Sequence, residues 1–378
     1  MKIADFLSAF NEVIPLAAIG YAKDAVGLQV GYGQGSEVTK ILLAYEVTNE
    51  VIDEAIGAGA NLIVSYHPLI FPNIGSVTDA TRTGSLLRRL IKNDLALYVI
   101  HTALDSHPEY GTSRLMANEL GLTDIRILMP LPEVLEKIVV FVPKPSVDAV
   151  REAMWEAGAG NISNYDECSF MSEGLGSFRG NEQSRPAIGK PLSRETVDEI
   201  RVEMIVEKWK AQNVIKKMIA AHPYEEVAYD KYSLANSHPK FGMGSIGKWS
   251  TPLSADAVLR LISQTFGTPA LRYNSTMKTE FSSAATLGGS GMDFYSKSKS
   301  QGAEIFITGD IHYHDFHKAE HDGVLLVDAG HAETERFVTD GMLKAVQAAC
   351  NVVNLYDELP QSLIIQSAVS PNVVRYYQ

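Results

Sequence analysis

The sequence predicts an α/β fold: a discontinuous body of two α/β lobes, interrupted by an inserted ferredoxin-like α+β domain. In the first and last thirds of the chain, short apolar runs alternate with helical patterns, which is typical of parallel sheets covered by helices. The middle follows a β-α-β-β-α-β order instead. These observations place the body at 1–130 and 235–378 and the insert at 131–234.

The first third opens with an amphipathic helix, because Ile3, Phe6, Leu7 and Phe10 share one helical face. The patterns that follow predict a strand at 40–47, a helix at 48–59, a strand at 61–68 that ends at Pro68, a helix at 83–94, a strand at 95–105 that runs into a loop, and a helix within 111–122. This alternation predicts a parallel sheet with helices on its faces.

The last third repeats the alternation. It predicts a strand at 282–294 that runs into a glycine-rich turn, strands at 303–310 and 323–331, and one long amphipathic helix at 333–350. In the insert we expect a strand, a loop and a helix at 137–160, a loop-rich section at 161–195, and a strand, a helix and a strand at 197–234.

Composition excludes several classes of protein. Among 378 residues, 46% are hydrophobic and 21% charged, as in an ordinary globular protein, and the net charge of −12 argues against a general nucleic-acid binder. The two cysteines, Cys168 and Cys350, form no CxxC pair, so neither a disulfide framework nor a thiolate zinc site is expected. No signal peptide and no membrane-spanning run is evident, so we expect a cytoplasmic protein without membrane partners.

Candidate ligands follow the predicted strands. His67 ends the strand at 61–68, Asp105 follows the strand at 95–105, and His331 with Glu335 follows the strand at 323–331. Because the carboxyl ends of parallel strands share one edge of a sheet, these side chains are expected to converge. Each signal has an ordinary alternative, a structural histidine or a solvated helix face.

His331 and Glu335 are spaced i, i+4 at the start of a predicted helix, so both point the same way. Imidazole nitrogens with carboxylate oxygens suit divalent Zn, Mn, Fe, Co or Ni. The sequence therefore predicts a divalent-metal site of His67, Asp105, His331 and Glu335.

Motifs along the whole chain support this interpretation. They are KDAVGLQVG (23–31), EVIDEAIGAGANLIVSYHPLIF (50–71), HTALD (101–105), GGSG (288–291), TGDIHYHD (308–315) and DAGHAETE (328–335). As an ordered set they resemble the NIF-three-like family, whose bacterial members are commonly called GTP cyclohydrolase I type 2 homologs. Within the insert, NYDECSF (164–170), GLGSF (174–178) and AAHPYEEVAYD (220–230) resemble the PII-like, divalent-cation-tolerance-like domain of longer members.

This resemblance implies a homohexameric toroid with a two-metal site. It implies that His67 and Asp105 bind one ion, that His331 binds the other, and that Glu335 can touch both. One departure stands out: Tyr66 replaces the first histidine of the HHP motif, which would bind the second ion. A phenol is a poor ligand at neutral pH, so one or two ions per chain are expected. Tyr66 is then either a core or wall residue or a hydrogen-bonding residue of the site.

Two smaller departures accompany it. Ala25 stands where the family's motif carries asparagine, and Glu46 stands where many members carry aspartate.

His101 and His314 are the candidate acid–base groups, with His312 as a further histidine nearby; each has an ordinary local alternative. Gly288, Gly289 and Gly291 either admit a phosphate or form a plain tight turn.

Two functions remain open at this point. One is a metal-dependent hydrolase of a nucleotide or phosphoester, in which the ion acidifies water. The other is a non-catalytic regulatory or metal-handling protein. The ligand of the insert is not predicted.

Overall fold

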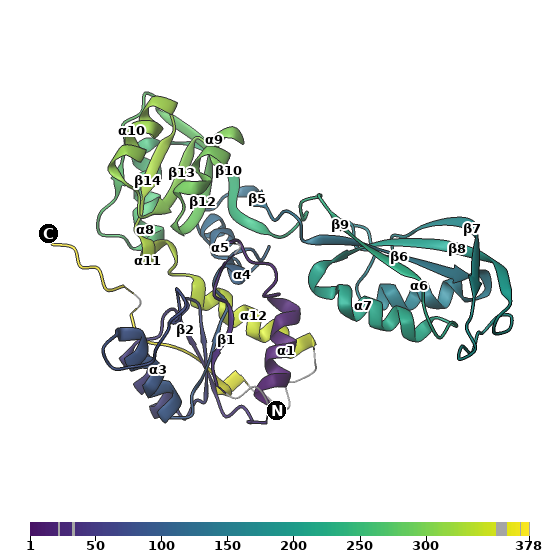
Figure 1. Cartoon of the computed structure of the whole chain (residues 1–378). Coiled ribbons are helices and arrows are strands. Elements are labelled where there is room, and N and C mark those ends of the chain that lie inside the picture. The colour runs from purple at the N-terminus through teal and green to yellow at the C-terminus, as the bar shows by residue number, and fades with distance from the viewer. Residues whose placement is uncertain (22, 32–34, 353–360, 371, 378) are drawn as a thin grey trace. The chain divides into compact units, whose positions relative to one another are not determined.

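The computed structural model describes residues 1–21, 23–31, 35–352, 361–370 and 372–377, and the chain divides into two compact units (Figure 1). The first unit joins Met1–Pro130 to Phe241–Gln378, so it is discontinuous in sequence. The second unit is Leu131–Lys240, which extends past the expected boundary at residue 234. None of the described helices combines the length and the apolar character that crossing a membrane requires.

The first sheet of the discontinuous unit has five strands. Their order across the sheet is β1 (Gly27–Val30), β4 (Ala96–Val99), β3 (Leu62–Ser65), β2 (Ile41–Ala44) and β15 (Ile364–Gln366). β1 is antiparallel to β4, and the other neighbours are parallel. Every residue of β2, β3 and β4 is buried, as expected for parallel strands that are covered on both faces.

Helices cover both faces of this sheet (Figure 1). α1 (Ile3–Val13) and α12 (Val338–Val352) pack on one face, and α2 (Asn49–Ala58) and α3 (Arg82–Lys92) pack on the other. Because side chains alternate along a strand, Ile41 and Leu43 of β2 join the first core, whereas Leu42 and Ala44 join the second. The amphipathic face predicted for α1 is confirmed: its Ile3, Phe6 and Phe10 are buried in the first core, and Leu7 packs against it.

The second sheet of this unit has six strands. Their order is β11 (Arg272–Tyr273), β14 (Leu325–Asp328), β13 (Ile305–Gly309), β12 (Glu280–Ser290), β10 (Gly242–Ser254) and β5 (Thr123–Pro130). β12, β13 and β14 run parallel. The helices around it are α5 (Thr112–Glu119), α8 (Ala255–Phe266), α9 (Tyr295–Ser300) and α10 (Tyr313–Asp322). Residues of α5 and α8 pack in one core, and residues of α9 and α10 in another.

Three local predictions for this unit were wrong. The strand at 95–105 stops at Val99, and residues His101–Asp105 form the short helix α4. The long helix predicted at 333–350 is two helices, α11 (His331–Thr334) and α12, with a break that turns Glu335 into the interior. Of the glycine-rich turn predicted at 288–291, Gly288 and Gly289 still lie within β12, and only Gly291 follows the strand. Each error falls at or just beyond the end of a strand, in segments that contain or adjoin the candidate ligands.

The inserted unit contains β6 (Leu135–Pro143), α6 (Val147–Glu156), β7 (Phe170–Arg179), β8 (Arg194–Glu207), α7 (Lys208–Ala221) and β9 (Tyr229–Leu234). Its antiparallel sheet has the order β7-β8-β6-β9. α6 and α7 contribute apolar side chains such as Met154 and Met218 to a core with Ile138 and Val202 of the sheet. β7 lies inside the section that was predicted to be loop-rich.

Candidate metal centre

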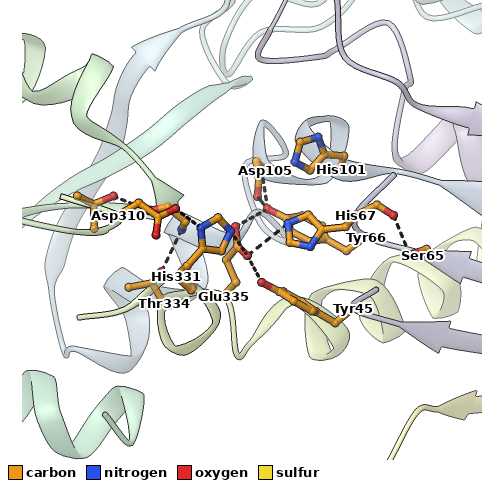
Figure 2. A network of polar contacts seen from close by, with 12 residues as sticks. Tyr45, Ser65, Tyr66, His67, His101, Asp105, Asp310, His331, Thr334 and Glu335 are labelled. Atoms are coloured by element: carbon orange, nitrogen blue, oxygen red, sulfur yellow. Dashed lines mark hydrogen bonds and ion pairs between the residues drawn. The ribbon is translucent and has the colours of Figure 1, made fainter. Parts of the chain in front are cut away.

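The candidate ligands come from strand ends of the discontinuous unit (Figure 2). His67 follows β3, and Asp105 ends α4, which follows β4. His331 is the first residue of α11, just beyond β14, and Glu335 is the C-cap residue of α11. β3 and β4 belong to the five-stranded sheet and β14 to the six-stranded sheet. The four side chains therefore come from strand ends of two sheets, and the expectation of one shared sheet edge was wrong.

Three of these residues form a convergent ligand set. One nitrogen each of His67 and His331 and one oxygen of Glu335 lie within 4.8 Å of one another. Nε2 of His331 lies 3.2 Å from Glu335 Oε2, and Nε2 of His67 lies 3.6 Å from the same oxygen. Two imidazoles and a carboxylate are a donor set that borderline divalent ions such as zinc accept. Among the described residues, these three form the candidate metal site.

Glu335 is the hub of this cluster. Its side chain is 4% exposed, and its Oε2 also accepts a 2.5 Å hydrogen bond from the hydroxyl of Tyr45, at the end of β2. Burial alone would raise the pKa of Glu335, but the hydrogen bond and charge of His331 outweigh it and hold that pKa below its ordinary value. Glu335 is therefore a carboxylate, the form that binds metal.

The two imidazoles have different environments. Burial lowers the pKa of His67 below its ordinary value, so a free nitrogen is available near neutral pH. The hydrogen bond to Glu335, reinforced by Asp310, raises the pKa of His331 to about 9. Asp310 Oδ2 lies 2.6 Å from His331 Nδ1, which leaves Nε2 directed at the site. A carboxylate behind the far nitrogen fixes the ring of a metal-binding histidine in this way.

Glycines make room for the ligands. Gly289 has φ +64°, and a Cβ there would lie 2.4 Å from Glu335 Oε1 and 3.2 Å from His331 Cε1. A Cβ on Gly309 would lie 2.9 Å from the backbone of His331. The glycine-rich motif therefore has a packing explanation: side chains larger than hydrogen would displace the ligands.

Tyr66 combines both of its predicted roles, because its ring is buried in the first core and its hydroxyl is hydrogen-bonded at the site. Its hydroxyl lies 3.0 and 2.9 Å from the two carboxylate oxygens of Asp105 and 3.3 Å from Glu335 Oε1. Asp105 thus lies against Tyr66 and is not one of the three residues with convergent ligand atoms. Burial, with a smaller contribution from Glu335, raises the pKa of Asp105 to about 6.

His101 lies beside the ligand set (Figure 2). Its ring centroid lies 5.5 Å from that of His67 and 5.3 Å from that of Tyr66. Nδ1 of His101 is 2.7 Å from Oδ1 of Asp24, whose side chain is 3% exposed. Oδ2 of Asp24 accepts hydrogen bonds from the backbone and the hydroxyl of Thr102. His101 itself has a φ of +22°, an uncommon conformation for a residue with a side chain.

His314 lies elsewhere. It is exposed on α10, and its ring contacts are with Tyr313 and His317. His312 is exposed at the start of the same helix, where its backbone N–H donates to Asp315. Among the described hydrogen bonds and ion pairs, none joins His312 or His314 to a candidate ligand.

Sequence reasoning missed Tyr45, Asp24 and Asp310 as members of the site. Tyr45 and Asp310 each follow a buried strand, the same signal that identified His67. Asp24 lies within the KDAVGLQVG motif. The signals were present, but a strand-end tyrosine or aspartate is common in proteins and does not by itself indicate a site.

The family model described as DUF34/NIF3 (NGG1p interacting factor 3) matches residues 1–358. The chain belongs to the DUF34/NIF3 family. The resemblance inferred from the ordered motifs is thereby confirmed.

Relatives of the NIF3 family align with most of this chain. The GTP cyclohydrolase 1 type 2 homolog of Halalkalibacterium halodurans is 40% identical over 311 residues, which are 82% of this chain and 83% of that protein. The Bacillus subtilis protein of the same name is 33% identical over 329 residues, 87% of each chain. The crystal structure of a Bacillus cereus protein related to NIF3 has a TM-score of 0.85 and 34% identity, covering 100% of this chain and 99% of that one.

Proposed function

We propose that this NIF3-family chain is a divalent-metal-dependent hydrolase of a nucleotide or another phosphoester. The observation that carries the proposal is the convergence of His67, His331 and Glu335 from the strand ends of two sheets. The name borne by relatives, GTP cyclohydrolase 1 type 2 homolog, supports a nucleotide substrate.

The donor set fits a borderline divalent ion. The three residues offer two imidazole nitrogens and a carboxylate oxygen, and among the described residues no thiol lies in the set. A bound Zn, Mn, Fe, Co or Ni ion would supply Lewis acidity and lower the pKa of water there. Asp310 and Tyr45 would hold His331 and Glu335 in the geometry that this requires.

His101 would move the proton. Asp24 fixes the ring through Nδ1, so Nε2 is the nitrogen left to accept a proton from water and to return it to a leaving group. The hydrogen bonds from Thr102 hold Asp24 in place. A carboxylate that orients a catalytic imidazole is a recurrent arrangement in hydrolases.

A cavity of about 540 Å³ is lined by Tyr45, which hydrogen-bonds to Glu335, and by Glu46, Asn49, Arg82 and Ser370. The three ligand residues themselves do not line it. Ligand sites typically have volumes of about 300–1,000 Å³. Arg82, which donates to Glu46, is a cation that a phosphate group would favour.

Oligomeric assembly is part of the proposal. We propose a homohexamer, as the motif resemblance implies. Light scattering of the purified protein would then give six times the chain mass of 41.3 kDa. A mass equal to that of one chain would contradict this part and leave the proposed chemistry intact.

The test of the activity is a substrate panel. Purified protein loaded in turn with zinc, manganese, iron, cobalt and nickel is assayed against nucleoside triphosphates, cyclic nucleotides and simple phosphoesters. We expect metal-dependent turnover that Glu335→Gln and His101→Gln abolish or strongly reduce, while Glu119→Gln, an exposed carboxylate on α5, leaves it intact. His314→Gln tests the second acid–base candidate in the same assay.

The panel also tests the competing function. Tight metal retention without turnover of any substrate would favour the regulatory or metal-handling role and contradict the hydrolase. If the Glu335→Gln variant turns over substrate at the wild-type rate, the assignment of the site is contradicted.

A further inference from the structure

The hydroxyl of Tyr66 lies between two carboxylates (Figure 2). It is 2.9 Å from Asp105 Oδ2, 3.0 Å from Asp105 Oδ1 and 3.3 Å from Glu335 Oε1. The side chain is almost completely buried, with 1% of the residue exposed. A buried position between two acidic groups is where a protein otherwise places a cation.

The Tyr66 hydroxyl is a hydrogen-bond donor. The Asp105 and Glu335 oxygens within 3.3 Å of it belong to carboxylates, which accept hydrogen bonds. A neutral phenol donates one proton and is a poor ligand for a divalent ion. The hydroxyl therefore joins the carboxylates by hydrogen bonding, and its oxygen occupies the space between them.

The remaining ligands complete one ion site. Oε2 of Glu335 faces His67 and His331, whereas Oε1 faces Tyr66. An ion shared by Asp105 and Glu335 Oε1 would have to stand about 2.0–2.2 Å from oxygens of both residues. The phenol oxygen already contacts both, so the second position is filled by a side chain of this protein.

We propose that each chain holds one divalent ion, at His67, His331 and Glu335, and that the Tyr66 hydroxyl replaces a second cation by linking Asp105 to Glu335. This inference rests on the proposed function, because it presupposes that the three residues bind metal. Asp105 then acts as a positioning residue, which holds Tyr66 and through it Glu335.

The test is the number of ions per chain. Wild type and Tyr66→His are purified from zinc-replete medium, desalted and measured by elemental analysis against protein concentration. We expect one ion in wild type and two in Tyr66→His, because an imidazole at this position adds a ligand to Asp105 and Glu335 Oε1. The double variant Tyr66→His, Asp105→Asn should return to one ion, and Asp105→Asn alone should keep one.

Tyr45 provides a matched control. Its phenol donates to Glu335 as that of Tyr66 does, but no bond to a second carboxylate accompanies it among the described contacts. Tyr45→His should therefore keep one ion. If it gains a second ion, the gain does not depend on the space between Asp105 and Glu335, and the inference is overturned.

The possible failures are distinguishable. Two ions in wild type would overturn the inference and leave the metal-dependent function standing, whereas no ion in wild type would overturn the function itself. A single ion in folded Tyr66→His would also overturn the inference. If that variant does not fold, X-ray absorption of zinc-loaded wild type decides: a metal–metal distance of about 3.5–4 Å would refute the single-ion site.

Discussion

Asp24 Oδ1 lies 2.7 Å from His101 Nδ1, although 77 residues separate them in sequence. Asp24 does not face the ligand set itself, so its effect on catalysis passes through the imidazole. We predict that Asp24→Asn lowers kcat by about 10- to 100-fold, because an amide no longer fixes the ring in one tautomer. KM and the number of bound ions should change little.

Steady-state kinetics beside elemental analysis checks this prediction. Thr102→Val, which removes one of the hydrogen bonds to Asp24, should give a smaller loss in the same direction. An Asp24→Asn enzyme with wild-type kcat would show that the carboxylate is a structural partner and no more.

Metal binding should stabilise the discontinuous unit. An ion at 100 times its dissociation constant adds about 2.7 kcal/mol to the free energy of unfolding. We therefore expect a chelator to lower the Tm of wild type by several degrees and to leave the Tm of His67→Ala or Glu335→Gln unchanged.

The control for this comparison is His321→Gln, at an exposed position of α10, which should keep the wild-type response. Differential scanning calorimetry with and without chelator makes the measurement. A chelator-sensitive Tm in Glu335→Gln would place the stabilising ion elsewhere.

Gly289→Ala should disrupt the site by displacing the side chain of Glu335. The methyl group would lie 2.4 Å from Glu335 Oε1, and the φ of +64° disfavours any side chain. We predict a loss of at least about 1–2 kcal/mol in unfolding free energy from the backbone alone, together with weakened metal binding.

Gly57→Ala is the matched glycine. Gly57 lies in α2 with open space where a Cβ would be, so alanine there should stabilise by about 0.5–1 kcal/mol. Chemical unfolding and zinc titration of the two variants test both expectations. If Gly289→Ala keeps wild-type zinc affinity, the glycine does not make room for the ligands.

His222 should make the stability of the inserted unit depend on pH. Its Nδ1 accepts the N–H of Tyr224 and its Nε2 lies 3.0 Å from the carbonyl of Phe141, so the ring is held neutral. Burial lowers the pKa of His222 below its ordinary value of 6.5. As the pH falls below 6.5 the unfolded chain binds a proton that the folded unit does not, so stability falls until the pH passes the folded pKa.

Hydrogen exchange of β6 amides at about pH 7.5 and pH 5.5, corrected for intrinsic rates, measures this effect. His222→Gln should flatten the difference between the two pH values, and His321→Gln should leave it unchanged. An equal pH response in wild type and His222→Gln would exclude His222 as its source.

Periodicity predicted the regular elements well because burial dictates them. Apolar patterns that only one kind of element can bury mark the strands around Ile41, Leu62 and Leu325 and the helix around Phe6. The errors lie where function competes with propensity: after Val99, where α4 replaces extended chain, and at Glu335, where a continuous helix would not turn the carboxylate inward.

The site was predictable in outline for a related reason. His67, His331 and Glu335 follow the carboxyl ends of parallel strands, and the structure brings these three residues together as expected. The predicted reason, one shared sheet edge, was wrong, because His67 follows a strand of the five-stranded sheet and His331 a strand of the six-stranded sheet. The link from Tyr66 to Asp105 depends on how deeply a side chain is buried and on which partner it meets across 39 residues. Such distances arise from three-dimensional packing, which periodicity does not encode.

The discontinuity of the first unit has a consequence for synthesis on the ribosome. His67 precedes the inserted unit and Glu335 follows it, so the inserted unit leaves the ribosome before the ligand set can be completed. Domains generally fold as units during translation, and here the inserted unit can do so first. A nascent chain that ends before His331 therefore contains the whole inserted unit but lacks two of the three candidate ligands, so the proposed binding of metal would have to follow synthesis of the last part of the chain.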